Sequence, residues 1–297
     1  MEKPNYEKCR LCARYCLVNR TSGERGFCRM GDKPAVARIS LHEWEEPIIS
    51  GERGSGTVFF VGCSLGCVYC QNKAISRGMG GREMTVGELA TAMLSLQNEG
   101  AHNINLVTPT HFIPSIIKAV KEARDRGLSV PIVYNTGSYD APDSIRSLEG
   151  TVDVYLPDLK YYRKSTAGKL SLAENYPRVA REAIAEMVRQ QSKPLVENGL
   201  IKKGVVVRLL LLPGHLAECK LNLKYLYDTY GDSIYISLMS QYTPVGDMKA
   251  PLNRRVSNEE YRELVDYALR LGVKNAFTQE GASASESFIP DFFGENK

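Results

Sequence analysis

Seven of the eight cysteines in this 297-residue chain lie within its first 70 residues. Three of them, Cys63, Cys67 and Cys70, have the spacing C-x3-C-x2-C and directly follow an apolar run. Disulfides are rare in the cytosol, where short cysteine spacings indicate metal or redox chemistry instead. Three thiolates can bind three irons of a 4Fe-4S cluster and leave its fourth iron open to a further ligand. The spacing therefore predicts an iron–sulfur cluster with one open position.

Composition places the chain among ordinary globular proteins. Hydrophobic residues make up 43% of it, which is enough for a sizeable core. The net charge of +4 is spread along the chain and gives no support to nucleic-acid or membrane binding, although it suits a small acidic partner. The first five residues lack the apolar core of a signal peptide, and no apolar run approaches the roughly 20 residues that span a bilayer. We therefore expect a cytoplasmic protein.

From residue 57 onward, short β-branched runs alternate with segments of helical periodicity. Near-continuous apolar runs are typical of parallel strands buried on both faces. They predict strands at Thr57–Gly62, Asn103–Val107, Val130–Asn135, Val152–Pro157, Val205–Leu212 and Ser233–Met239, and a short final strand within Gly272–Glu280. Six strands, each followed by a helix or a long crossover, predict an α/β fold of the partial (β/α)6 barrel type. A doubly wound sheet is the alternative.

Helices are predicted between these strands. Thr85 and Glu88 form a capping-box pattern, and Ser257 and Glu260 have the same spacing before another helix. Further helices are predicted at Leu216–Tyr230 and within Leu172–Gln190, where a proline at position 177 indicates the start. Residues 1–50 show little helix or strand periodicity. We therefore expect two parts, a Cys-rich segment at 1–50 that binds metal and a partial barrel at 51–297.

The cysteine motif resembles a known family. C-x3-C-x2-C with an aromatic residue, Tyr69, before the last cysteine is the signature of radical S-adenosylmethionine (SAM) enzymes. The resemblance implies that the open iron binds the amino and carboxylate groups of SAM. One electron, from an external donor such as flavodoxin or ferredoxin, then breaks the sulfonium bond to give a 5′-deoxyadenosyl radical that abstracts hydrogen from a substrate. The family's fold is a six-unit partial barrel, in agreement with the strand count.

A narrower resemblance is to the pyruvate formate-lyase activating enzyme-like subgroup, from Cys9 to about Lys160 and more weakly to Gln241. Its landmarks are the early cysteines, Glu45-Glu46-Pro47-Ile48, Gly54-Ser55-Gly56-Thr57, Cys70-Gln71-Asn72 and Asp158-Leu159-Lys160. This resemblance implies an oxidoreductase whose target is a glycine Cα of a partner enzyme. Modification of a peptide, or of a small molecule held inside the barrel, is the alternative.

A second cysteine set, Cys9, Cys12, Cys16 and Cys28, lies in the Cys-rich segment. Four thiolates suffice to saturate a zinc ion or a further iron–sulfur cluster. Zinc would stabilise a segment too short for its own core, whereas a cluster would relay electrons to the first one. Activating enzymes usually carry extra clusters after the first motif, but these cysteines precede it. Both metals therefore stay open.

Cationic side chains suit the SAM carboxylate. Lys160, two residues after Asp158, resembles the lysine that approaches this carboxylate in activating enzymes. Arg208 lies inside an apolar run, where an unpaired charge is costly, so it either meets the cofactor or pairs with Asp158. Asn135 ends the third predicted strand and is assigned to the ribose hydroxyls, with a turn cap as the alternative.

The second predicted strand ends at Thr108, where many radical SAM enzymes carry a Gly-Gly-Glu-type element that meets the amino group of the cofactor. We assign Thr108, or backbone carbonyls beside it, to that role. Gln241 and Tyr242 follow the sixth strand at the expected mouth of the barrel and are candidates for substrate contact. His111 and Cys219 are expected to be structural, the latter as an inert buried thiol.

One function of another class is also compatible with the cysteines. The chain could serve as a non-catalytic iron–sulfur electron carrier or as a zinc scaffold protein. The three-cysteine motif and a barrel large enough to enclose a ligand favour the radical enzyme. Formation of 5′-deoxyadenosine by the reduced protein distinguishes the two.

Overall fold

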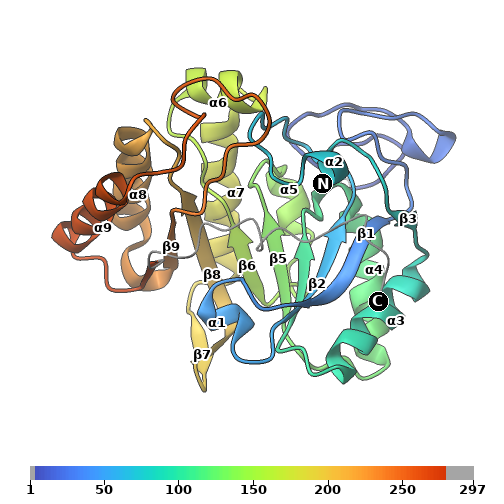
Figure 1. Cartoon of the computed structure of the whole chain (residues 1–297). Helices are drawn as coiled ribbons and strands as arrows, with labels where there is room; N and C mark the ends of the chain where they lie inside the picture. The colour runs from blue at the N-terminus through green and yellow to red at the C-terminus, as the bar shows by residue number, and fades with distance from the viewer. Residues whose placement is uncertain (1–3, 279–297) are drawn as a thin grey trace.

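The computed structural model describes residues 4–278, which one mixed sheet organises (Figure 1). Its strands are β1 (Ala35–His42), β2 (Ser55–Phe60), β3 (Arg82–Glu83), β4 (Ile104–Val107), β5 (Ile132–Thr136), β6 (Val154–Pro157), β7 (Leu195–Glu197), β8 (Leu200–Leu210), β9 (Tyr235–Met239) and β10 (Ala276–Thr278). Neighbouring strands follow the order β10-β9-β8-β6-β5-β4-β2-β1-β3, and β7 pairs with β8 outside this path.

The strands β2, β4, β5, β6, β8, β9 and β10 pair in parallel in that order, whereas β3 and β7 pair antiparallel with β1 and β8. A doubly wound sheet would reverse its strand order at a switch point. This sheet has no such reversal, so the predicted α/β fold with a partial barrel is confirmed and the doubly wound alternative is wrong. The six predicted strands correspond to β2, β4, β5, β6, β8 and β9. The short final strand is present as β10, although residues 279 and 280 of the predicted range lie outside the described residues.

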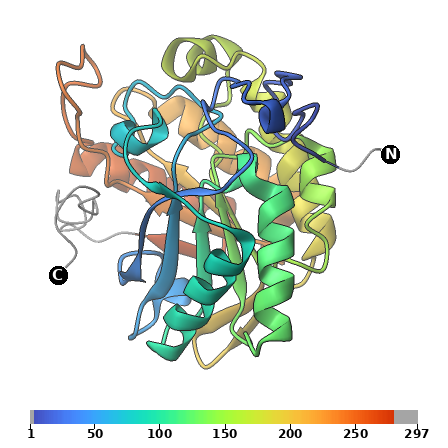
Figure 2. The same cartoon turned by 90° about the vertical axis from the view of Figure 1, so that its right-hand side faces the viewer.

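Helices connect the strands and cover the outer face of the sheet (Figures 1 and 2). They are α1 (Pro47–Ser50), α2 (Lys73–Ser76), α3 (Val86–Asn98), α4 (Ile113–Asp125), α5 (Pro142–Arg146), α6 (Lys164–Ser171), α7 (Tyr176–Gln190), α8 (Leu216–Tyr230) and α9 (Asn258–Leu271), with 3-10 turns at Arg20–Ser22, Thr110–Phe112 and Gly231–Ser233. Within residues 4–278, no helix is long and apolar enough to cross a membrane.

The predicted helix starts are confirmed. Thr85 and Ser257 each accept a hydrogen bond from the backbone N–H of the glutamate three residues on, which completes two capping boxes. Helix α7 begins at Tyr176 with Pro177 in its first turn. Sequence analysis missed the helix α6, whose residues Lys164–Ser171 carry few apolar side chains.

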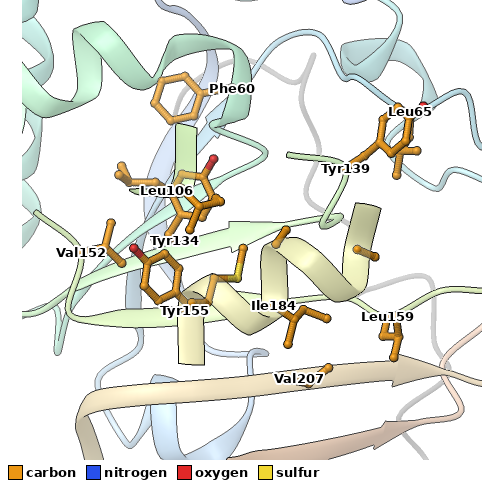
Figure 3. Close-up of a cluster of buried hydrophobic side chains, with 14 of the residues drawn as sticks. Phe60, Leu65, Leu106, Tyr134, Tyr139, Val152, Tyr155, Leu159, Ile184 and Val207 are labelled. Atoms are coloured by element: carbon orange, nitrogen blue, oxygen red, sulfur yellow. The ribbon is translucent and has the colours of Figure 1, made fainter. Parts of the chain in front are cut away.

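The main core lies between the sheet and the outer helices (Figure 3). Tyr134, Tyr155 and Val207 come from three strands and are fully buried against Ile184 of α7 and its neighbours. Each buried side chain of this size contributes roughly 1.5–3 kcal/mol. This core fixes the strands whose opposite face forms the interior of the barrel.

The interior of the barrel is partly filled by α1. Side chains alternate along a strand, so Val133, Val154 and Val206 point away from the outer helices. They pack with Ile48 and Ile49 of α1 in a second, smaller hydrophobic cluster. The turn before α1 is thereby brought into the barrel, where it contributes to the polar groups described next.

Residues 4–50 contain more regular structure than expected. Strand β1 pairs antiparallel with β2 over the register from Val36 opposite Phe60 to His42 opposite Ser55. Its residues are mostly half-buried, so the apolar periodicity is weak and sequence analysis missed the strand. The division of the chain at residue 50 stays a prediction, although β1 extends the sheet of the barrel from the N-terminal side of that boundary.

Candidate active site

The cysteine loop starts where β2 ends. Gly62 opens the loop with a φ of +86°, a left-handed conformation that glycine adopts without penalty. The N–H groups of Gly66 and Val68 donate to the carbonyl oxygens of Ser171 at 3.1 Å and Leu170 at 2.9 Å. The loop is therefore held between the end of β2 and the end of α6.

The three cysteines of the motif have surroundings that suit a bound metal cluster. Burial, followed by the neighbouring thiol of Cys67, raises the pKa of the Cys63 thiol to about 12. The Leu65 N–H donates to Cys63 Sγ at 3.4 Å, and the Ser171 hydroxyl donates to Cys67 Sγ at 2.9 Å. Metals bind cysteine as thiolate, so a positive centre would offset the burial and the existing donors would stabilise the sulfurs. These residues fit a cluster on the three thiolates.

Cys67 and Cys70 line a cavity of about 260 Å³, at the end of the barrel where the cysteine loop lies. The cavity joins this loop to side chains from several strands and from the loop after β9. Its lining residues are His42, Trp44, Glu45, Phe59, Cys67, Tyr69, Cys70, Gln71, Asn72, Asp158, Lys160, Arg208, Leu210, Met239, Gln241 and Tyr242. The sequence predictions that meet in it are two cluster cysteines, Tyr69, Asp158, Lys160, Arg208, Gln241 and Tyr242.

A charged network forms one wall of the cavity. Lys160 Nζ lies 2.6 Å from Asp158 Oδ2, and Arg208 Nε lies 2.8 Å from Asp158 Oδ1. Arg208 also reaches Glu45 Oε2 at 3.2 Å. The four side chains are only 11–19% exposed, so their charges are weakly screened. Arg208 therefore pairs with Asp158, as one alternative expects. It also lines the cavity, and its contact with the cofactor stays a prediction.

The network sets the protonation states of its members. Burial alone would raise the pKa of Asp158, but Arg208 and Lys160 outweigh it and lower that pKa below its usual value. Burial alone would lower the pKa of Lys160, but Asp158 and the sulfur of Cys67 outweigh it and raise that pKa. A Lys160 ammonium beside the cysteine loop is thus stabilised, as an anionic ligand group would require.

Glu45 belongs to this network and was not predicted as a site residue. Its Oε1 accepts hydrogen bonds from the side-chain amides of Asn105 at 3.0 Å and Asn135 at 3.2 Å. Burial, partly offset by Arg208, raises the pKa of Glu45. The residue comes from the turn between β1 and α1. That turn lies before the start of the predicted barrel. Glu45 stands in one of the landmarks of the subgroup resemblance, but nothing in its local sequence assigned it a role in the site.

Two predicted cofactor contacts do not line the cavity. Asn135 is buried, and its Oδ1 accepts a hydrogen bond from Arg208 Nη2 at 2.6 Å. Thr108 has a φ of +59°, and its N–H donates to the backbone oxygen of Asn135 at 2.8 Å. Both residues therefore lie beside the network rather than on the cavity surface.

The residues that were expected to be structural are buried. His111 is 1% exposed, and its Nε2 lies 2.7 Å from the backbone oxygen of Val61. Cys219 in α8 is 7% exposed. His42, Trp44, Phe59, Gln71 and Asn72 line the cavity but were not predicted, because β1 was missed and nothing marked the others as ligand contacts.

The second cysteine set lies in the loops of the Cys-rich segment, with Cys9, Cys12 and Cys28 buried and Cys16 half-buried. Burial raises the pKa of the Cys12 thiol, and the nearby thiols of Cys28, Cys9 and Cys16 raise it further. Within residues 4–278, no three His, Cys, Asp or Glu side chains are gathered closely enough to hold a single metal ion. The same holds for Cys63, Cys67 and Cys70, so the metal of the second set, zinc or a further iron–sulfur cluster, stays a prediction.

A buried arginine fixes the loops that carry the second cysteine set to the barrel (dark blue, at the upper right of Figure 1). Arg20 is 1% exposed and donates to the backbone oxygens of Met30 at 3.1 Å, His111 at 2.5 Å and Gly31. Its guanidinium also lies over the ring of Tyr6, 4.6 Å from the centroid. The two cysteine sets are therefore held in neighbouring parts of the molecule.

Comparison with known proteins agrees with this arrangement. The chain is 29% identical over 276 residues to uncharacterized protein MJ0674 of Methanocaldococcus jannaschii, covering 89% of this chain and 75% of that protein. Its structure is similar to a radical SAM methyltransferase from Sphaerobacter thermophilus, with a TM-score of 0.54, 18% identity, and coverage of 78% of this chain and 69% of that one. It is also similar to Streptococcus suis SuiB bound to S-adenosylmethionine, with a TM-score of 0.52, 11% identity, and coverage of 78% and 52%.

At such low identities, the solved structures show a shared fold and nothing finer. The family comparison goes further, because the model of the radical SAM superfamily matches residues 57–226, more than half of the chain. The match begins in β2, includes the cysteine loop, Asp158, Lys160 and Arg208, and ends in α8. The chain therefore belongs to the radical SAM superfamily.

Proposed function

We propose that the chain is an enzyme that cleaves SAM reductively at a 4Fe-4S cluster held by Cys63, Cys67 and Cys70. Membership of the superfamily implies both the cluster and SAM. The observation that carries the proposal is the single cavity that joins two of these cysteines to Lys160 and its charged network. When bound, the reduced cluster supplies one electron that splits SAM into methionine and a 5′-deoxyadenosyl radical, which takes a hydrogen atom from the substrate.

The residues of the cavity suit the groups of SAM. The ammonium of Lys160 lines the same cavity as Cys67 and Cys70, and the Cys67 sulfur helps to raise its pKa; it is assigned to the SAM carboxylate. Tyr69 and Asp158 are assigned to the cavity wall beside it. Asn135 is assigned to holding Arg208, which it meets at 2.6 Å, and Thr108 to holding Asn135 through its backbone. Lys160→Met should then weaken SAM binding by tenfold or more, as measured by equilibrium dialysis.

The proposed substrate is a glycine Cα of a partner enzyme or a peptide, as the likeness to activating enzymes suggests. SuiB, which shares the fold, has also been solved with the precursor peptide SuiA bound, so a peptide is the second substrate class to test. The proposed electron donor is an external flavodoxin or ferredoxin, and the proposed location is the cytoplasm. Gln241 and Tyr242 line the cavity and are assigned to substrate contact.

The decisive experiment is a 5′-deoxyadenosine assay on anaerobically reconstituted, reduced protein. The wild-type chain should form 5′-deoxyadenosine from SAM, and Cys63→Ala, Cys67→Ala and Cys70→Ala should each abolish it. Cys219→Ala is the matched control, because this buried thiol lies in α8, outside both cysteine sets. Absence of product from wild-type protein with an intact cluster would favour the electron carrier instead.

We also propose a second metal centre at Cys9, Cys12, Cys16 and Cys28. Support comes from the raised pKa of Cys12, to which the thiols of Cys28, Cys9 and Cys16 contribute, and from the position of Cys28 beside Gly62 of the cysteine loop. Iron and zinc analysis of the wild-type chain and of a Cys9→Ser, Cys12→Ser variant identifies the metal. Loss of iron beyond the first cluster indicates a further iron–sulfur cluster, loss of zinc indicates a zinc site, and unchanged content of both rejects the centre.

A further inference from the structure

A chain of three buried hydroxyls ends at the sulfur of Cys67. The Ser171 hydroxyl donates to Cys67 Sγ at 2.9 Å. Tyr161 Oη lies 2.5 Å from Ser171 Oγ, and Tyr69 Oη lies 2.7 Å from Tyr161 Oη. Ser171, Tyr161 and Tyr69 are 0%, 1% and 6% exposed, so water does not compete for these bonds.

A thiolate at Cys67 fixes the direction of every bond in this chain. A thiolate sulfur only accepts, so the proton of Ser171 points to it and Ser171 Oγ must accept from Tyr161. Tyr161 then has no second proton, so its oxygen accepts from Tyr69. All three O–H dipoles therefore point toward the sulfur, and each polarises the next.

The end of α6 holds the donor rigidly. The backbone oxygen of Ser171 accepts a hydrogen bond from the Gly66 N–H at 3.1 Å. Arg14 of the Cys-rich segment donates to the backbone oxygens of Leu172 at 2.5 Å and Ser64 at 2.9 Å, which ties the end of α6 to the cysteine loop. The hydroxyl is thus pre-organised, as a donor that tunes a metal ligand must be.

We propose that Ser171, supported by Tyr161 and Tyr69, is a positioning residue that makes the cluster easier to reduce. This inference rests on the proposed function, which places a cluster on Cys67. One electron from the external donor adds one negative charge to the cluster and its thiolates, and no bond forms or breaks and no proton moves. Hydrogen-bond donors at sulfur stabilise that added charge, so they raise the reduction potential.

The test is a potentiometric titration of the reconstituted full-length protein without SAM, followed by the EPR signal of the reduced cluster. At the wild-type midpoint, Ser171→Ala should lower the ratio of reduced to oxidised cluster about tenfold, a shift of about 59 mV for one electron. Ser171→Thr keeps a hydroxyl and should recover most of the shift. Tyr161→Phe leaves the last donor in place and should give a smaller shift of the same sign.

The matched control is Ser165→Ala, which removes an exposed hydroxyl from the same helix and should leave the midpoint unchanged. A midpoint in both Ser171→Ala and Tyr161→Phe equal to that of wild type would overturn the inference, as would a shift to higher potential. Failure here is distinguishable from failure of the proposed function. In the first case wild-type protein still forms 5′-deoxyadenosine from SAM, whereas in the second it does not.

Discussion

Arg208 holds two nearly buried carboxylates, Asp158 at 2.8 Å and Glu45 at 3.2 Å. Removing one partner of such a network leaves charges without compensation, at a cost of about 3–5 kcal/mol. We therefore expect Arg208→Met to lower the free energy of unfolding by that amount in urea denaturation. Arg178→Met is the control, because its pair with Glu182 is exposed and worth about 0.5 kcal/mol. Equal losses of free energy of unfolding in Arg208→Met and Arg178→Met would show that Arg208 does not stabilise the buried carboxylates.

His111 should make stability depend on pH. Burial, with Arg20 adding to it, lowers its pKa to about 3, whereas an unfolded histidine titrates near 6.5. Between these values only the unfolded state binds the proton, so the free energy of unfolding falls as pH falls, by up to about 1.4 kcal/mol per unit. His111→Gln keeps a donor for the Val61 carbonyl but does not titrate. Between pH 7 and 5 its stability should therefore fall by about 2 kcal/mol less than that of the wild-type chain, and parallel curves would refute this.

At the residue scale, the sequence predicts those site residues that belong to a local motif. The cysteine spacing predicted Cys67, the resemblance to activating enzymes predicted Lys160, and a charge inside an apolar run predicted Arg208. The three residues line one cavity. Glu45 could not be found this way. Its partners Asn105 and Asn135 come from different strands, and only the folded chain brings them to one point.

At the element scale, the junction between the cysteine loop and the Cys-rich segment is closely packed. A Cβ on Gly62 would lie 2.5 Å from Met30 Cγ and 2.8 Å from the Cys28 oxygen, at a φ of +86°. Gly127 has a similar φ of +103° but open space around it. The left-handed conformation should lower the free energy of unfolding of both alanine variants by about 1–2 kcal/mol. Overpacking should lower that of Gly62→Ala by about 1–3 kcal/mol more.

Urea denaturation of Gly62→Ala and Gly127→Ala measures that difference directly. The expected result is a lower stability for Gly62→Ala, accompanied by lower iron content because Cys63 is displaced. Equal free energies of unfolding for the two variants would show that the Cys-rich segment can shift away from Gly62 and that the junction is loosely packed.

The elements that sequence analysis recovered are those with strong local signals. Buried parallel strands have continuous apolar runs, and α3 and α9 have capping boxes. Strand β1 and helix α6 were missed, since half-buried positions in β1 and a polar helix sequence in α6 leave little periodicity. Both missed elements matter for the site, because β1 leads to Glu45 and α6 ends at Ser171.

At the scale of the whole molecule, the seven parallel strands β2, β4, β5, β6, β8, β9 and β10 stand in the sheet in their sequence order. That correspondence made the partial barrel predictable from the number and spacing of apolar runs. The docking of the Cys-rich segment was not predictable, because it depends on Arg20 reaching backbone oxygens far away in the sequence, such as that of His111.

The central claim is that three thiolates hold a cluster whose fourth iron is open to SAM. The most direct measurement is the EPR spectrum of the reduced protein before and after addition of SAM. The spectrum of the wild-type chain should change on SAM addition, and a Cys63→Ala, Cys67→Ala, Cys70→Ala variant should lose the SAM-sensitive signal. A spectrum that SAM leaves unchanged, or a SAM-sensitive signal that survives in the triple variant, would contradict the claim.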